Sequence, residues 1–146
     1  MDDVLKRVGR LSLIKSRHQD PQEIAPYLRF DDKRECFIFG LDPLAALSEP
    51  LSINGAKTYT LRCDDIPIAM CGTVPIDDET ARVWLLGTGG INANFRTFLR
   101  ECKWVADLLQ DNYRVMENFV PIDHQETISW LTWCGFTFDE NLYEIN

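Results

Sequence analysis

The sequence predicts an α+β domain with a mixed, mostly antiparallel sheet flanked by helices. Two features indicate this class: helical start signals dominate residues 20–50, and a period of two with tight turns follows at residues 57–86. A third feature is the strand, long helix and strand that succeed one another in residues 82–120. Because such a run requires a crossover, at least one pair of strands is expected to be parallel.

The first third of the chain is expected to be mainly helical. Asp20 can cap a helix that carries Pro21 at its first position, and Asp42 with Pro43 repeats this arrangement. Pro50 limits the helix that Asp42 begins. The expected elements are a short helix at residues 2–8, a strand at 11–15, and helices at 20–29, 30–39 and 44–47.

The remainder alternates strands and helices. Asp64 and Asp65 form the turn of a hairpin, the acidic residues 77–79 form the next turn, and Gly135 is expected to stop the last helix. The expected elements are strands at residues 57–62, 66–74 and 80–86, a helix reaching Asp111, a strand at 115–120, a helix from 123 or 124 to 133, and a closing hairpin at 136–145.

Length and composition narrow the class of protein. The 146 residues are expected to form a single domain, residues 1–146, and the formal charge of -8 without a basic run argues against a nucleic-acid partner. No stretch approaches the ~18 apolar residues that a membrane span needs. Five scattered cysteines without a C-x-x-C pair indicate a reducing, cytoplasmic compartment and no metal site.

A glycine-rich turn at residues 87–90 links the strand at 82–86 to the long helix. Glycine turns leave backbone N–H groups uncovered, and the start of a helix adds further unpaired N–H groups and a positive dipole end, so this corner is a candidate phosphate site. The alternative is a tight turn with no ligand.

Several short stretches lie along the chain in a recognisable order and spacing. Residues 127–136 form a closing stretch that ends in Gly135 and Phe136. The shorter stretches are Gly40–Leu47, Pro67–Gly72, Trp84–Thr88, Phe98–Arg100, Trp104–Val105, Glu117–Val120 and Gly135–Phe136. The closing stretch resembles that of the GNAT acyltransferase superfamily, and the shorter stretches together resemble, within it, the internal virion protein A type of short-tailed phages.

The resemblance implies a GNAT-like fold in which two parallel strands, one ending near Leu86 and one starting near Val115, splay apart to hold acetyl-CoA or another acyl-CoA. The catalytic base would be Glu117 or His124, with Asp123 as a further candidate. Leu131 stands where many members have a catalytic tyrosine, and the basic residue of their phosphate motif is missing. The cofactor-binding residues that the resemblance implies are Leu86, Gly87, Thr88, Gly89, Gly90, Asn92 and Arg96.

Two functions are compatible with these features. The missing tyrosine and basic residue favour a phage GNAT-like protein with a degenerate acyl-CoA site, which acts as a virion-associated or host-interaction module. Its partners would be other phage virion proteins or host proteins, in the host cytoplasm or packaged in the virion. The alternative is an active acyl-CoA-dependent N-acetyltransferase that acts on an amine of a small molecule or a basic protein.

Overall fold

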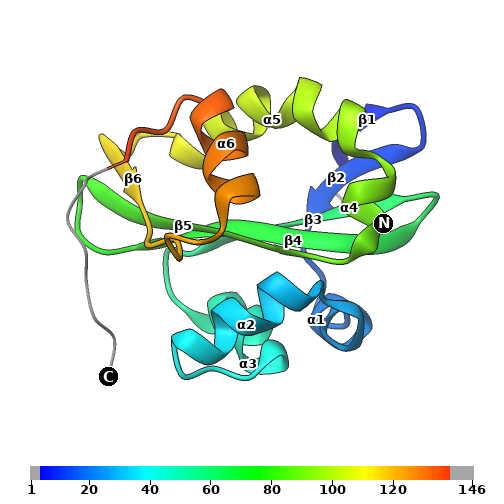
Figure 1. Cartoon of the computed structure of the whole chain (residues 1–146), viewed down its shortest axis with the longest axis horizontal. Coiled ribbons are helices and arrows are strands. Elements are labelled where there is room, and N and C mark those ends of the chain that lie inside the picture. The colour runs from blue at the N-terminus through cyan, green and yellow to red at the C-terminus, as the bar shows by residue number, and fades with distance from the viewer. Residues whose placement is uncertain (1–3, 139–146) are drawn as a thin grey trace.

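The computed structural model describes residues 4–138 and confirms the α+β class (Figure 1). Six strands form one sheet in the order of the sequence, and every neighbouring pair is antiparallel except β5 and β6, which are parallel. The strands are β1 (Val4–Val8), β2 (Leu11–Lys15), β3 (Lys57–Cys63), β4 (Ile66–Pro75), β5 (Thr80–Gly87) and β6 (Val115–Glu117). The α-helices are α1 (Asp20–Ile24), α2 (Phe30–Ile38), α3 (Pro43–Ser48), α4 (Gly89–Ala93), α5 (Phe95–Gln110) and α6 (Gln125–Trp133), and two 3₁₀ helices are η1 (Ala25–Tyr27) and η2 (Glu49–Ser52).

Helices cover both faces of the sheet, with α1, α2 and α3 on one side and α5 and α6 on the other (Figure 1). Successive side chains of a strand point to opposite faces, so Met70 of β4 packs with Ile24 and Leu47 below the sheet, whereas Cys71 packs with Leu109 above it. The sheet therefore separates two apolar cores. Within the described residues, no helix combines the length and apolar character that crossing a membrane requires.

The N-terminal prediction of a helix at residues 2–8 is wrong. Val4–Val8 is a strand that pairs with β2, and the turn between them uses Gly9 at φ +58°. Tertiary pairing overrides local preference here, because β2 would otherwise have no partner on that side. Asp20 also differs from its expected role: it is fully buried inside α1 and accepts hydrogen bonds from the Arg17 amide and the Thr60 hydroxyl.

Other boundaries follow the sequence more closely. The Asp42 carboxylate caps α3 by accepting the Ala45 N–H at 3.0 Å, and Gly135, at φ +103°, ends α6. The strand expected at residues 115–120 stops at Glu117. Residues 136–138 lie outside any strand, and the rest of the expected closing hairpin lies outside the described residues.

Candidate functional site

Strands β5 and β6 run side by side for only a short distance. Their pairing begins at Thr80 with Val115 and ends at Arg82 with Glu117, yet β5 continues to Gly87. Beyond this point the Asn118 side chain donates a hydrogen bond to the Val83 carbonyl at 2.6 Å, and the chain then leaves β5. The two parallel strands therefore diverge, as the resemblance implied.

A cleft of about 1400 Å³ occupies the space where the strands diverge. It opens on both faces of the sheet, since its walls come from α2 below and from α5 and α6 above. The residues that line it lie in or directly beside α2, β5, β6 and α6 and include Arg29, Asp31, Asp32, Glu35, Trp84, Leu85, Glu117, Asn118, His124, Thr127 and Trp130.

The backbone N–H and C=O of Leu85 face this cleft. The Val83 carbonyl accepts from Asn118, the Gly87 N–H donates to Asp32, and the Gly87 carbonyl accepts the Arg29 N–H, so the odd-numbered residues of β5 direct their backbone groups away from β4. Leu85 lies between Val83 and Gly87, opposite Cys71 of β4 in a pair that shares no backbone hydrogen bond. Within the described chain β6 does not extend far enough to pair with Leu85, which leaves its N–H and C=O available to a ligand.

Two buried indole N–H groups border the cleft. Among the described residues, neither Trp84 Nε1 nor Trp130 Nε1 has a hydrogen-bond acceptor, although both atoms are buried. Both residues line the cleft, and Trp84 also packs against the lower core. Because neither nitrogen is exposed, neither can reach a ligand without movement of its side chain.

The glycine corner is occupied largely by the protein's own contacts. The Gly87 N–H donates to Asp32 Oδ2 at 2.8 Å, Thr88 N–H donates to the Ile68 carbonyl at 2.9 Å, and Gly90 N–H donates to Thr88 Oγ1 at 3.1 Å. A Cβ atom on Gly90 would lie 2.6 Å from Ile68 Cγ2. Close packing therefore accounts for Gly90. The donors that remain for an anion are the Gly89 N–H and the first-turn amides of α5.

A buried carboxylate holds α2 against the end of β5. Asp32 is 2% exposed and binds the Arg29 guanidinium at 3.0 Å as well as the Gly87 amide. Burial raises the pKa of Asp32, and the nearby Arg29 charge and the Gly87 hydrogen bond oppose this rise only in part. Arg29 also donates to Asn92 Oδ1 at 3.2 Å, which joins the same corner to α4.

Glu35 lies one helical turn after Asp32 and is the titratable group best suited to proton transfer. Its side chain lines the cleft and is half-buried, and no hydrogen bond from a described residue meets its carboxylate. Burial and the Asp32 charge raise the pKa of Glu35 to about 7, with Arg29 opposing. A carboxylate with this pKa accepts protons efficiently near neutral pH. Sequence reasoning missed it, although the i, i+3 spacing of Asp32 and Glu35 would have placed both on one face.

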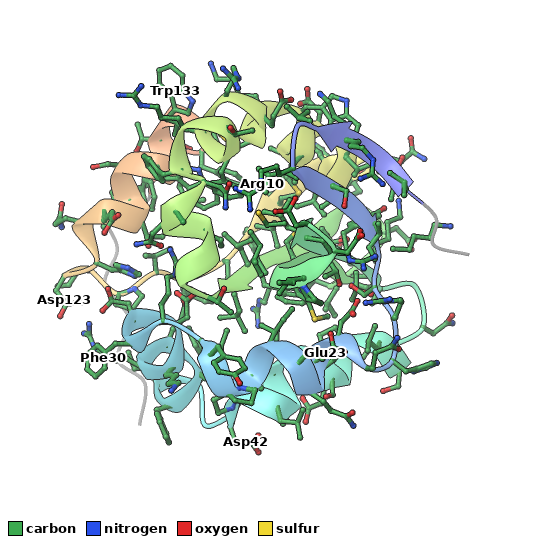
Figure 2. All side chains as sticks on the ribbon, turned by 90° about the vertical axis from the view of Figure 1, so that its right-hand side faces the viewer. Arg10, Glu23, Phe30, Asp42, Asp123 and Trp133 are labelled. Atoms are coloured by element: carbon green, nitrogen blue, oxygen red, sulfur yellow. The ribbon has the colours of Figure 1, made fainter. Side chains whose placement is uncertain are left out.

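An ion pair and a histidine–carboxylate contact tie α2 to the segment that precedes α6. Arg34 binds Asp123 at 2.6 Å, and His124 Nε2 lies 3.4 Å from Asp31 Oδ2. Figure 2 labels Asp123 and Phe30, the first residue of α2, on the same side of the view. The His124 side chain is 11% exposed and its Nε2 is also 2.9 Å from Thr127 Oγ1. These contacts bridge the cleft from its lower wall to its upper wall.

Only some of the catalytic and cofactor-binding residues predicted from the sequence line the cleft. Glu117 and His124 both line it, Glu117 as an exposed side chain at the end of β6, and Asn92 lines it beside Arg29. Leu131, in the place of the tyrosine, lines it too. Leu86 instead faces the lower core, and Arg96 is exposed and does not line the cleft.

The described residues contain no group of His, Cys, Asp and Glu side chains that could hold a metal ion.

Comparison with known proteins confirms the predicted GNAT-like fold. No protein-family profile and no curated protein sequence matches the chain. A "possible acetyltransferase" from Clostridium difficile 630 is 14% identical with a TM-score of 0.57, over 94% of this chain and 98% of that one. A mutant spermidine N-acetyltransferase from Vibrio cholerae is 11% identical with a TM-score of 0.62, over 89% and 81%. An aminoglycoside N-acetyltransferase in complex with CoA is 11% identical with a TM-score of 0.55, over 95% of each.

The packing at the glycine corner predicts different tolerance at two neighbouring positions. Gly90→Ala should lower the free energy of unfolding by roughly 1–3 kcal/mol because its methyl group meets Ile68. Gly89→Ala is the matched control, since a Cβ there meets nothing within 4 Å, and it should change stability by less than about 0.5 kcal/mol. Urea denaturation measures both. Equal tolerance of the two substitutions would contradict the packing account of Gly90.

The raised pKa of Glu35 predicts a pH dependence of stability. Between the ordinary value of 4.5 and about 7 the folded chain binds a proton that the unfolded chain does not, so the free energy of unfolding falls as pH rises through this window. Glu35→Gln should remove roughly 1–3 kcal/mol of the wild-type decline between pH 4.5 and pH 8. Glu23→Gln, at an exposed position of α1, should leave the decline unchanged. Identical pH profiles for wild type and Glu35→Gln, measured by urea denaturation, would exclude a Glu35 pKa near 7.

Proposed function

We propose that the chain is an acyl-CoA-dependent N-acyltransferase. The single observation that carries this proposal is the divergence of β5 and β6 next to the Glu35 carboxylate, to which none of residues 4–138 donates a hydrogen bond. It gives one cleft with backbone donors on one wall and a proton acceptor on the other. The GNAT-like fold of the structural neighbours supports the same reading, although at 11–14% identity their likeness establishes the fold alone.

The acyl-pantetheine arm fits the cleft better than the diphosphate fits the glycine corner. Leu85 offers an N–H and a carbonyl in the position of a missing strand. At the corner, however, the Asp32 carboxylate already accepts the Gly87 N–H. The groups that remain for phosphate are Gly89 N–H, the start of α5 and the exposed Arg96.

When bound, acyl-CoA would supply a thioester. The amine nitrogen would attack its carbonyl carbon, the C–S bond would break, and the CoA thiolate would leave and take a proton from solvent. In the proposed mechanism, the Leu85 N–H donates to the carbonyl oxygen on which negative charge develops. Glu35 takes the proton from the acceptor nitrogen, either directly or through water. Glu117 and His124 remain the alternative bases, since both line the cleft.

The charge of the cleft favours a cationic acceptor. Its lining includes Asp31, Asp32, Glu35, Glu117 and Glu126, whereas its positive charge comes from Arg29, which already binds Asp32. An ammonium group would be attracted to this wall and held near the proton acceptor. The proposed acceptor is therefore an amine of a small molecule or of a basic protein.

A second candidate is a GNAT-like module without catalysis, such as the virion-associated or host-interaction role that the sequence resemblance implied. The observation that favours it is the Asp32 carboxylate at the Gly87 amide, which places a fixed negative charge where a phosphate would bind. Leu131 in place of the tyrosine also favours it. Co-purification with phage particles would support this candidate.

Titration with acetyl-CoA separates the two candidates. At 100 times its Kd the ligand should stabilise the fold by about 2.7 kcal/mol and raise the Tm by roughly 6–10 °C in a thermal-shift assay. Acetyl-pantetheine, which lacks the diphosphate, is the matched probe and should retain part of the shift because the donors of Leu85 remain. No shift with either compound at millimolar concentration would contradict the transferase proposal.

The assignment of the base predicts a specific kinetic pattern. Glu35→Gln should lower kcat roughly 10²- to 10⁴-fold and leave the acetyl-CoA thermal shift unchanged, because the amide cannot accept the proton. The wild-type kcat/KM should rise with pH through about 7 as Glu35 ionises. Thiol release measured against a panel of primary amines gives both values.

Two further variants serve as controls for that assignment. If Glu35 is the base, Glu117→Gln and His124→Ala should retain most of the turnover. A large loss of kcat in either of them, together with near-normal turnover in Glu35→Gln, would transfer the role to that residue.

A further inference from the structure

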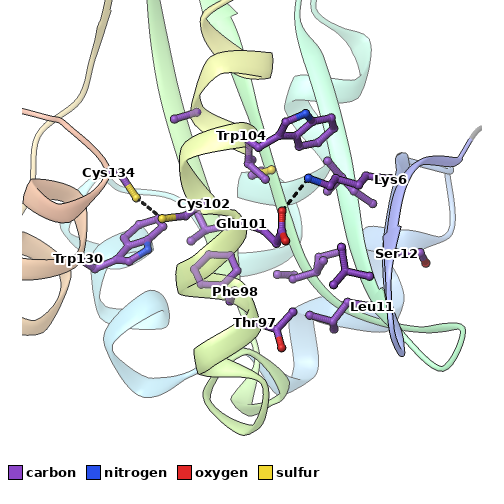
Figure 3. Close-up of a pocket in the computed structure, with 18 of the residues that line it drawn as sticks. Lys6, Leu11, Ser12, Thr97, Phe98, Glu101, Cys102, Trp104, Trp130 and Cys134 are labelled. Atoms are coloured by element: carbon purple, nitrogen blue, oxygen red, sulfur yellow. Dashed lines mark hydrogen bonds and ion pairs between the residues drawn. The ribbon is translucent and has the colours of Figure 1, made fainter.

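Two cysteines meet on the side of the sheet opposite α2. Cys102 lies in the middle of α5, and Cys134 is the residue that caps the C-terminus of α6, 32 positions later. The Cys134 thiol donates to Cys102 Sγ, and the two sulfur atoms are 2.7 Å apart (Figure 3). All five cysteines are free thiols in the structure, and no other pair of them is in hydrogen-bond contact in the described chain.

We propose that Cys102 and Cys134 are a redox modification site, at which a small-molecule disulfide oxidises the two thiols to a protein disulfide that fixes α6 to α5. The sulfur atoms need to approach by only about 0.7 Å to reach the bond length of about 2.0 Å. This proposal does not depend on the transferase activity.

The surroundings of the pair permit this approach. Both residues line an apolar cavity of about 90 Å³ between α5, α6 and the sheet, which leaves space for the side chains to rotate (Figure 3). Cys102 is 3% exposed, whereas Cys134 is half-buried at the end of its helix. An oxidant in solution would therefore reach Cys134 first, and Cys102 would act as the resolving thiol.

The exchange balances with one equivalent of oxidant. Cys134 loses its proton to solvent, its thiolate attacks one sulfur of the small disulfide, and the first small thiolate leaves. Cys102 then loses its proton and attacks Cys134 Sγ, which forms the Cys102–Cys134 bond and releases the second small thiolate. Two electrons pass from the protein to the oxidant. Burial and the neighbouring Cys102 raise the pKa of Cys134 and Lys103 lowers it, so the first step is expected to be slow at neutral pH.

A Cys102–Cys134 disulfide would join α5 to α6, the two helices that form the upper wall of the cleft. Other contacts between these helices include the stack of Phe98 on Trp130, with ring centroids 5.3 Å apart, and a hydrogen bond from Trp133 Nε1 to the Leu99 carbonyl at 3.3 Å. The Lys103 ammonium also lies 4.7 Å from the centroid of the Trp133 ring. No residue of α6 is fully buried. A covalent bond beside Trp130 and Phe136, which both line the cleft, would hold that wall in place.

The test equilibrates the full chain with mixtures of oxidised and reduced glutathione and counts free thiols by maleimide mass tagging after denaturation. The wild type should lose two of its five thiols under oxidising mixtures, and peptide mapping should place the bond between Cys102 and Cys134. The oxidised protein should melt roughly 5–10 °C higher than the reduced protein.

Single substitutions provide the controls. Cys134→Ser should lose no thiols to an internal bond, and Cys102→Ser should accumulate glutathione on Cys134. Cys63→Ser, on β3, should form the bond as the wild type does. Five free thiols in the wild type at every ratio, a bond that maps to another pair, or a persistent glutathione adduct on wild-type Cys134 would each overturn the proposal.

Discussion

The buried Asp32 carboxylate is the interaction on which the site depends. It joins the guanidinium of Arg29 at the start of α2 to the backbone amide of Gly87 at the end of β5. A buried charge that loses its partner typically destabilises a protein by about 3–5 kcal/mol, so this contact fixes the position of α2 strongly. Because Glu35 lies one turn further along the same helix, its place in the cleft follows from the position of Asp32.

The same carboxylate shapes the electrostatics of the cleft in two ways. Its charge disfavours ionisation of Glu35 and so contributes to a pKa near neutrality. It also occupies the amide of Gly87, which reduces the number of donors that an incoming phosphate would find. Asp32 thus helps Glu35 to accept a proton near neutral pH, and it also weakens phosphate binding at the Gly87 amide.

The sequence predicted the fold class and the parallel pair, because the strand–helix–strand order is a local feature. The divergence of the two strands was expected only from the resemblance to the GNAT superfamily. The sequence did not predict β1, whose pairing with β2 is a tertiary effect that the local pattern of residues 2–8 does not indicate. It found Glu117 and His124 at the cleft but missed Glu35, since the pKa of that carboxyl depends on burial in the folded protein. The use of the glycine-corner donors by Asp32, Ile68 and Thr88 likewise arises only from three-dimensional contacts.

The absence of fully buried residues in α6 has a consequence for how the cleft is reached. Helices with few buried apolar side chains detach in local opening events of low free energy, while the rest of a domain remains folded. Strands β2–β5 carry much of the buried core, so hydrogen exchange should be slow there and fast along α6. A bulky ligand would then enter through transient displacement of α6, without unfolding of the sheet on which its binding groups are mounted.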